Sequence, residues 1–448
     1  MTSTALVYGL AVTGVATTRA LVARGWRVTV ADDRVTDAMR AAAAELGVEL
    51  VEAPTGASLT ELVAGVELVT PSPGLPERHP LFAVAVDAGV PVRSELELAY
   101  GWEQARPGGP RPMVAITGTD GKTTTTLMAT AMVEASGRRA AAAGNTELPL
   151  VEAIDRDLDA FVVECSSFRL AFTEHFRTEA AVWLNLAPDH QDWHRSMDGY
   201  QEAKARLWDH QRPADAAIGN ADDPIVMAHL AVAPGRHVTF GTGGDYYVDG
   251  AELRGPQGTL TSVADLRRAL PHDVADALAA AAGVLEADVA TVGGVAAGLA
   301  GFTAPRHRIE LVATVGGVEW YDDSKATTPH AAATAIRGFH DVVLLAGGRN
   351  KGLDLGPLGD VATHVRAVVV LGEAADEVAT VFHAAAPELP VTVAGSMADA
   401  VEVARGLARA GDTVLLSPAC ASFDWYSSYG ERGDDFARLV HELQGVEG

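Results

Sequence analysis

The sequence predicts an α/β protein built on parallel sheets with crossover helices. Apolar, strand-like runs alternate with Ala-rich helical stretches along most of the chain, which is typical of this class. The length of 448 residues suggests about three domains. Two breaks, a Pro/Gly linker at 106–112 and the end of an Ala-rich helical region at 301–310, divide the chain into segments near 1–106, 110–303 and 305–448.

Each segment opens with a predicted strand. The first opens with "ALVYGL", which precedes a helical stretch. The second follows the linker at 106–112 with "MVAITG" and a long helical run. The third follows residues 301–310, where an Ala-rich helical region ends and a strand pair begins, and "DVVLLAGG" predicts a further strand there.

Composition excludes several classes of protein. Hydrophobic residues make up 48% and charged residues 21%, as in a globular protein with a core. The net charge is −25 and no block of Lys and Arg occurs, so we expect no nucleic-acid partner. Two cysteines indicate a reducing compartment. The apolar start lacks a preceding basic residue, and no run is long enough to span a membrane, so we expect a cytoplasmic protein.

The stretch "ITGTDGKTTTT" (116–126) predicts a phosphate-binding loop of unusual length. The standard motif requires glycine five residues before Gly121, where Ile116 stands, and only Gly118 lies upstream. A strand, a Gly-rich loop and a helix nevertheless follow one another here. Lys122 could reach the outer phosphates and the Thr123 hydroxyl could bind magnesium. The alternative is a plain turn with a surface lysine, which this context disfavours.

A second glycine turn lies near the start of the chain. Gly9 and Gly14 bracket a turn between a strand and a helix, and Asp32 stands at the end of the next strand. This arrangement is similar to a dinucleotide-binding fingerprint. Ala11 replaces its middle glycine, however, and a Cβ there would obstruct a pyrophosphate. A nucleotide-like ligand and a purely structural turn therefore stay equally open.

Other polar residues follow predicted strands. Glu164 ends a buried strand beside the phosphate loop and could hold magnesium or cap a helix. His190 and His194 have the spacing of a zinc pair, but Gln191 replaces the glutamate that this motif needs. His190 as a magnesium ligand or as a plain loop histidine stays open. Lys204 alone would be interpreted as a surface helix lysine.

The stretch "DSKAT" (323–327) follows a strand and is predicted to begin a helix. An acid, a hydroxyl and a lysine at one strand end could bind an anion or position an amine. The alternative is that Asp323 or Ser324 only caps the helix.

Together these stretches resemble the Mur ligases, the ATP-dependent amide-bond ligases of peptidoglycan synthesis. The shortened loop "TGTDGKTT" is similar to the loop of this family. Within the family the sequence resembles the MurD type, and the resemblance covers essentially the whole chain. The stretches that carry it are "SPGL", "ECSSFRL", "PDHQDWH", "YQEAKARLW", "RHRIE", "DDSKAT", "GGRNKGLD" and "SPACASFDWYSSYGERGDDF".

The resemblance implies a Rossmann-like N-terminal domain, a central P-loop ATPase-like domain and a Rossmann-like C-terminal domain. It implies an ADP-forming ligase that adds D-glutamate to UDP-N-acetylmuramoyl-L-alanine through an acyl phosphate, for cell-wall synthesis. The expected partners are these small molecules and ATP, and the expected cofactors are Mg²⁺ and a carbamylated lysine at Lys204. We expect a monomer with no membrane partner.

The resemblance also places site residues. The catalytic residues are Lys122, His190 and Lys204, and the metal ligands are Thr123, Glu164, His190 and Lys204. ATP is assigned to Gly118, Thr119, Asp120, Gly121, Lys122, Thr123, Thr124, Asp276, Arg308 and Asp323. The UDP substrate is assigned to Val12, Thr13, Asp32, Ser72, Gly74 and Asn145. The incoming amino acid is assigned to Lys325, Thr327, Lys351, Ser422 and Tyr429.

Four positions depart from the family pattern. Asp120 replaces a loop asparagine, and Glu147 stands where glycine is usual. Asp273 and Asp276 replace two asparagines, the second of which contacts adenine in the family. A carboxylate only accepts hydrogen bonds whereas an amide also donates, so the departure at Asp276 bears on the nucleobase and not on the phosphates.

Three alternatives stay open from sequence. A folate-type glutamate ligase shares the loop and the chemistry but lacks the combination of "SPGL" and "SPACAS". An NAD-binding oxidoreductase is disfavoured by Ala11 and by the second phosphate loop. A catalytically silent nucleotide-binding scaffold is disfavoured by the presence of Lys122, Glu164, His190 and Lys204.

Overall fold

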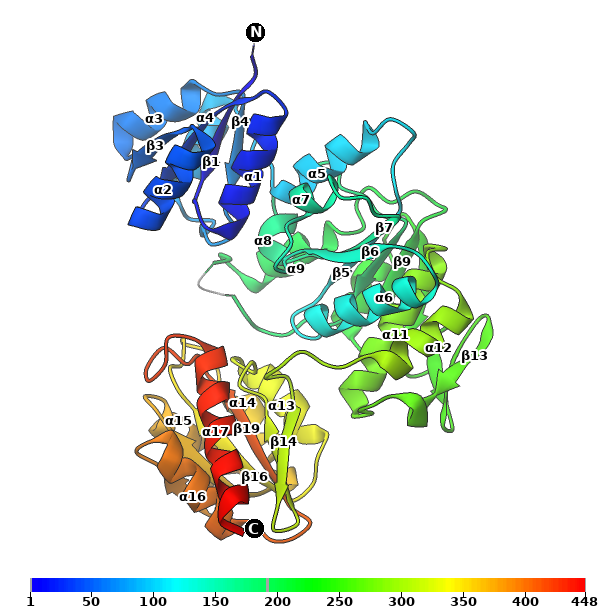
Figure 1. Cartoon of the computed structure of the whole chain (residues 1–448), viewed down its shortest axis with the longest axis vertical. Helices are drawn as coiled ribbons and strands as arrows, with labels where there is room; N and C mark the ends of the chain where they lie inside the picture. Colours follow the sequence, from blue (N-terminus) through cyan, green and yellow to red (C-terminus); the bar gives the residue numbers. More distant parts are fainter. Residues whose placement is uncertain (1, 191–192, 448) are drawn as a thin grey trace. The chain divides into compact units, whose positions relative to one another are not determined.

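The structure is a computed structural model that describes residues 2–190 and 193–447 (Figure 1). The chain forms two compact units, and each is described by itself. The first comprises Met1–Leu186, His190–Ala269 and Asp273–Phe302. The second comprises Ala187–Asp189, Leu270–His272 and Thr303–Gly448.

The first unit begins with a four-stranded parallel sheet of order β3-β2-β1-β4. Its strands are β1 (Thr4–Tyr8), β2 (Arg27–Asp32), β3 (Glu49–Glu52) and β4 (Leu68–Pro71). The helices that alternate with them are α1 (Val12–Ala23), α2 (Asp37–Leu46), α3 (Gly56–Ala64) and α4 (Pro80–Ala88). All five residues of β1 are buried, as its apolar sequence predicts.

A six-stranded parallel sheet of order β10-β9-β8-β5-β7-β6 follows in the same unit (Figure 1). Its strands are β5 (Met113–Thr117), β6 (Ala140–Gly144), β7 (Ala160–Glu164), β8 (Ala180–Trp183), β9 (Ala216–Asn220) and β10 (Arg236–Phe240). Its helices are α5 (Glu95–Gln104), α6 (Lys122–Ala135), α7 (Leu150–Ala153), α8 (Ser167–Leu170), α9 (Met197–Ala205), α10 (Pro224–Leu230), α11 (Pro271–Glu286) and α12 (Val292–Gly301).

This unit also holds a small antiparallel sheet that the sequence analysis did not predict. It consists of β11 (Tyr247–Asp249), β12 (Glu252–Gly255) and β13 (Gly258–Ser262), followed by the short helix η1 (Val263–Asp265). The three residues of β11 are all exposed, and the strand is too short to give a periodic pattern in the sequence.

The second unit contains a six-stranded sheet of order β14-β15-β19-β16-β17-β18. Only β14 pairs antiparallel, with β15. The strands are β14 (Glu310–Val315), β15 (Val318–Asp322), β16 (Val342–Gly347), β17 (Val365–Leu371), β18 (Val391–Val393) and β19 (Thr413–Ala419). The helices are α13 (Pro329–Arg337), α14 (Gly356–Gly359), η2 (Ala362–His364), α15 (Ala375–Ala385), α16 (Met397–Leu407) and α17 (Tyr429–Glu447).

The prediction of a helix beginning within 323–327 is wrong. Helix α13 begins at Pro329, and the Thr328 hydroxyl accepts from Ala331 N, so neither Asp323 nor Ser324 caps it. A proline at the first helical position after a threonine cap explains this start.

The predicted alternation and parallel sheets are confirmed, and loops lie at both predicted breaks. The three segment boundaries themselves stay predictions, because the first two segments belong to one compact unit. None of the described helices is both long and apolar enough to cross a membrane.

Candidate active site

The phosphate loop joins β5 to α6. Gly121 has φ +82°, a conformation that favours glycine, and α6 begins at the next residue, Lys122. The Lys122 ammonium folds back over the loop and donates to Gly118 O at 2.9 Å and to Thr119 O at 2.6 Å. The predicted order of strand, loop and helix is therefore confirmed, and the lysine lies over the loop itself.

Lys204 lies against the same loop and is not a surface residue. Its side chain is on α9 but only 1% of the residue is exposed, and Nζ donates to Gly118 O at 2.6 Å. Nζ also lies 4.6 Å from the ring centroid of Tyr200, whose hydroxyl is 3.1 Å from Thr119 Oγ1. Two ammonium groups thus converge on one carbonyl oxygen, Gly118 O.

Asn185 is a loop residue that the sequence analysis missed. Its Oδ1 accepts from Thr119 N at 2.9 Å and from Asp120 N at 3.0 Å, and its amide donates back to Asp120 O at 3.2 Å. Asn185 thereby fixes the loop backbone. The available signal was a polar residue soon after the buried strand β8.

The two aspartates on α11 that depart from the family pattern, Asp273 and Asp276, have different surroundings. A Cβ built on Gly121 would lie 2.6 Å from Asp276 Oδ1, so this carboxylate lies against the phosphate loop. Asp273 is buried and forms a 2.6 Å ion pair with Arg268. Of the two, Asp276 is therefore the one placed to affect a nucleotide.

Glu164 ends β7 beside the strand that leads into the loop, since it pairs with Ile116. Only 1% of the residue is exposed. Oε1 accepts from Asn145 Nδ2 at 2.7 Å, whereas Oε2 is buried with no hydrogen-bond partner. A buried carboxylate oxygen requires a partner, and hard divalent cations prefer such oxygens. The residues present therefore fit a magnesium ion.

The two histidines of the predicted pair have different partners. His190, at φ +54°, packs its ring against Phe168 at 4.6 Å and near Tyr200 at 6.0 Å between centroids. His194 is buried, with Nδ1 3.0 Å from Glu77 Oε1 and Nε2 2.9 Å from Ser167 Oγ. His190 thus lies near Lys204, because both contact Tyr200, whereas His194 joins Glu77 to Ser167 at the start of α8. Gln191 lies outside the described residues.

The first glycine turn is held by the Asp32 side chain and by a close approach between the backbone at Gly9 and Gly14. Asp32 accepts from Leu10 N at 2.9 Å, and a Cβ on Gly14 would lie 1.9 Å from Gly9 O. Ser72 lies next to the turn, because a Cβ on Gly9 would be 2.4 Å from Ser72 Cβ. Of the other residues predicted for the UDP substrate, Val12 and Gly74 are exposed and Thr13 is half-buried.

Arg169 joins this turn to Glu164 and was also missed. Only 4% of it is exposed. It donates through Nη2 to Thr13 Oγ1 at 3.0 Å and through Nη1 to Asn145 Oδ1. Thr13 and Asn145, both predicted for the UDP substrate, are therefore held by one guanidinium.

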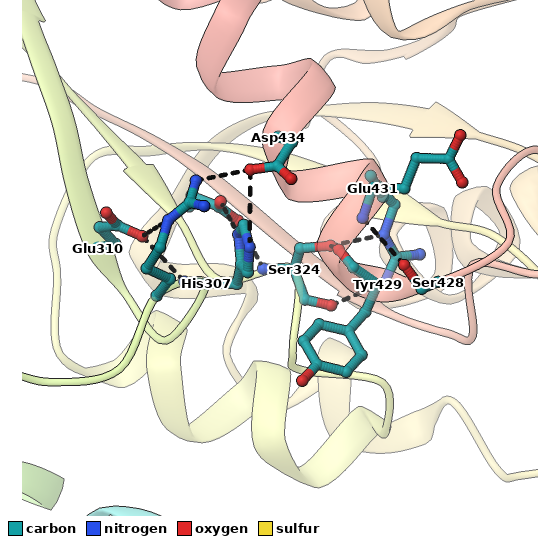
Figure 2. A network of polar contacts seen from close by, with 10 residues as sticks. His307, Glu310, Ser324, Ser428, Tyr429, Glu431 and Asp434 are labelled. Carbon is teal, nitrogen blue, oxygen red and sulfur yellow. Dashed lines mark hydrogen bonds and ion pairs between the residues drawn. The ribbon is translucent and has the colours of Figure 1, made fainter.

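In the second unit, Asp323 and Lys325 follow β15, and they lie beside residues of β19 and α17, respectively. Ser417 Oγ donates to Asp323 Oδ2 at 2.7 Å. Lys325 Nζ lies 3.9 Å from the ring centroid of Tyr429. The buried Arg432 donates to Ser324 Oγ at 2.9 Å, and Ser324 Oγ donates to Tyr429 O at 2.8 Å (Figure 2).

The other predicted amino-acid residues lie on neighbouring loops of the same unit. Backbone hydrogen bonds between Arg349 and Ala421 join the loop after β16 to the loop after β19. These loops carry Lys351, which is exposed, and Ser422, which is 2% exposed. Thr327 is half-buried. The loop contacts bring Lys351 and Ser422 to the same edge of the sheet.

Two residues that precede β14 in the second unit form contacts with its sheet and with α17. His307 Nδ1 lies 2.6 Å from Asp322 Oδ2, and Arg306 donates to Asp434 at 2.6 Å (Figure 2). The hydrogen bond to Asp322 raises the pKa of His307, against the opposing effect of burial. Arg308, the predicted ATP contact, follows directly in the chain and is half-buried.

Comparison with known families gives matches in order along the chain. Residues 3–94 match the Mur ligase MurD-like N-terminal domain, and residues 116–268 match the Mur ligase middle domain. Residues 307–420 match the Mur ligase glutamate ligase domain.

Curated relatives extend over nearly the whole chain. A UDP-N-acetylmuramoylalanine–D-glutamate ligase of Frankia casuarinae is 44% identical over 98% of this chain and 94% of its own. The enzyme of the same name from Thermobifida fusca is 41% identical over 98% of each chain.

Solved structures show the same fold at low identity. MurF from Acinetobacter baumannii superposes with a TM-score of 0.60 at 18% identity, over 97% of this chain and 90% of that one. A pseudomurein peptide ligase type C from Methanothermus fervidus gives 0.60 at 16% identity, over 98% and 100%. From the ordered domain matches and the full-length relatives, we conclude that this chain belongs to the Mur ligase family, in its MurD-like branch.

Proposed function

We propose that this chain is an ATP-dependent ligase that joins D-glutamate to UDP-N-acetylmuramoyl-L-alanine in peptidoglycan precursor synthesis. The relatives with full-length similarity carry this name. The observations that most support the chemistry are the convergence of Lys122 and Lys204 on Gly118 O and the unpartnered carboxylate oxygen of Glu164 at the end of the neighbouring strand β7.

The reaction requires a better leaving group than hydroxide. The substrate carboxylate attacks the γ-phosphorus of ATP, the bond to the β-phosphate oxygen breaks, and ADP leaves. The glutamate amine then attacks the acyl carbon, loses a proton, and phosphate departs with the bonding electron pair. Lys122 is placed to neutralise the oxygens of the transferring phosphoryl group, which approach another anion in the first step.

A magnesium site on Thr123, Glu164, His190 and Lys204 is part of the proposal. Bound Mg²⁺ would supply charge neutralisation between the carboxylate and the triphosphate. An ammonium at Lys204 would repel the ion, whereas a lysine carbamate offers two oxygens. The carbamate keeps one N–H, which can still donate to Gly118 O, so the observed contact is compatible with the modification.

The second unit is proposed to bring the amino acid. Glutamate carries two carboxylates, which suits the cations Lys325 and Lys351, with Thr327, Ser422 and Tyr429 around them. Arg308 and Asp323 are proposed to contact ATP. The domain boundaries near 106 and 303, a monomeric state and a cytoplasmic location also stay predictions.

Phosphate release with UDP-N-acetylmuramoyl-L-alanine, ATP and Mg²⁺ tests the function directly, with D- or L-glutamate as acceptor. We expect release only when D-glutamate and the UDP substrate are both present. Lys122→Ala serves as the inactive control. Release with a folate in place of the UDP substrate, or no release with either isomer of glutamate, would contradict the proposal.

A further inference from the structure

Arg169 is a buried cation with partners from three parts of the first unit. It stands on α8, and only 4% of it is exposed. Its guanidinium contacts Thr13 at the start of α1, Asn145 after β6, and Glu95 on α5, whose Oε1 lies 3.2 Å from Nε. A planar guanidinium presents donors in fixed directions, so its position sets the positions of these partners relative to one another.

The contact with Asn145 determines which way that amide points. A guanidinium can only donate, so it requires the oxygen of Asn145. The Asn145 nitrogen then faces Glu164, and Nδ2 donates to Oε1 at 2.7 Å. With Oε1 held in this way, Oε2 is the oxygen left for a metal ion. Arg169 therefore acts on Glu164 through Asn145.

The contact with Thr13 extends this series of hydrogen bonds to the first glycine turn. The Thr13 hydroxyl accepts from Arg169, and within residues 2–190 and 193–447 no acceptor is found for its proton. A hydroxyl can donate while it accepts, so Thr13 can bind a ligand oxygen without releasing Arg169. A ligand at Thr13 and a metal ion at Glu164 would then share one bridging cation.

We infer that Arg169 is a positioning residue that couples binding of the UDP substrate at Thr13 to the metal affinity of Glu164. This inference rests on the proposed function, because that function places the substrate at Thr13 and the metal ion at Glu164. Arg169 itself contacts neither the reacting carboxylate nor the transferred phosphoryl group in this role.

Binding of Mn²⁺ tests the inference without turnover. Electron paramagnetic resonance measures Mn²⁺ affinity in the presence of an ATP analogue with a β,γ-imido bridge. The variant is Arg169→Met combined with Glu95→Gln, which removes both charges of the buried pair and leaves no lone carboxylate. We expect a loss of about ten- to a hundredfold in Mn²⁺ affinity, as for other residues that orient a metal ligand.

Arg19→Met is the matched control. Arg19 also joins α1 to the central sheet region, through a 2.7 Å ion pair with Glu152 on α7, but it is half exposed and lies outside the chain of contacts. It should keep wild-type Mn²⁺ affinity. A folded double variant with unchanged Mn²⁺ affinity, or an equal loss in Arg19→Met, would overturn the inference.

A separate measurement tests the coupling between the UDP substrate and the metal ion. UDP-N-acetylmuramoyl-L-alanine should tighten Mn²⁺ binding to the wild type, and at a saturating concentration of this substrate the double variant should lack this enhancement. An enhancement that survives in the folded double variant contradicts the coupling.

If the double variant lacks a cooperative unfolding transition and is therefore not folded, the same measurements are made on Arg169→Lys. An ammonium keeps the charge opposite Glu95 but cannot reproduce the planar fork that holds Thr13 and Asn145 together. Wild-type Mn²⁺ affinity and enhancement in this variant would refute the inference. The basal affinity is read without glutamate or product, so it is independent of whether the ligase reaction itself is found.

Discussion

In the first unit, Lys122 and Lys204 both donate to the backbone of the phosphate loop, and Lys204 is 1% exposed. In the second unit, Lys325 lies over the ring of Tyr429 and Lys351 is exposed. The first pair is positioned by the folded unit before any substrate binds. We therefore expect the first pair to affect the rate of the chemical step and the second pair to affect glutamate binding.

Lys122→Ala tests the expectation for the first unit, and it should have the largest effect on the rate of the chemical step. The ammonium is held over the loop that we propose binds the phosphates of ATP, so its loss should remove charge stabilisation in the transition state. We expect kcat to fall on the order of 10³-fold or more while the unfolding transition is kept. Steady-state kinetics and thermal denaturation check this, and a near-normal kcat would contradict the assignment of the phosphate site.

Lys204→Met should have the next largest effect. It keeps much of the buried volume but removes the nitrogen that would carry a carbamate. We expect at least about a hundredfold loss of activity, since loss of a metal ligand exceeds the cost of losing a residue that orients one. Acetate added to the smaller variant Lys204→Ala should restore part of the activity. Activity indifferent to both substitutions would remove Lys204 from the metal site.

Lys351→Ala tests the expectation that the lysines of the second unit affect glutamate binding. Its exposed side chain is expected to bind a carboxylate of glutamate. The loss of one charge-assisted contact should raise the KM for glutamate roughly ten- to a hundredfold, with kcat nearly unchanged. Each substrate is varied in turn in the phosphate-release assay. A change in the KM for ATP or for the UDP substrate instead would place the glutamate pocket elsewhere.

Tyr429→Leu should have a smaller effect of the same kind. The ring lies 3.9 Å from Lys325 Nζ and is 37% exposed, so the cation–π contact is partly solvated. Such contacts contribute about 0.5–1 kcal/mol. Loss of this energy corresponds to an increase of about two- to fivefold in the KM for glutamate. Tyr429→Phe is the matched control and should keep the KM. A large effect of the control would point to the Tyr429 hydroxyl as a ligand contact.

The smallest expected effect is on stability and concerns His307. Asp322 raises its pKa in the folded unit, so protonated His307 stabilises the fold. This contribution is complete below the unfolded pKa of about 6.5 and is lost as pH rises through the higher folded pKa. His307→Gln should remove that part of the pH dependence. Urea denaturation of both proteins across this range measures it, and identical pH profiles would contradict the assignment.

The sequence predicted local features better than contacts between distant segments. Strand β1 and the phosphate loop were recognisable because apolar runs and glycine positions are local signals. The start of α13 was missed although Thr328 and Pro329 form a standard helix start. Strand β11 is only three residues long, so it is too short to show a hydrophobic period.

The site shows the same limit. Lys122 was predicted from its motif, whereas the burial of Lys204 depends on contact with a loop 86 positions earlier in the chain. Asn185 and Arg169 hold the loop and Glu164 through partners 65 and 24 residues away. The position of Asn185 soon after β8 was a weak signal that many ordinary polar side chains share, and the local sequence around Arg169 gave none.

The pairing of β15 with β19 also has a consequence for synthesis on the ribosome. Asp323 and its partner Ser417 are 94 positions apart, so the β15 edge cannot be completed until β19 has been translated. At about 5–20 residues per second, this delay is roughly 5–20 seconds. During that time the β14–β15 hairpin can form alone, with the β15 edge that β19 later covers still unpaired and open to association with other nascent chains. The predicted amino-acid pocket is therefore among the last parts of the protein to form.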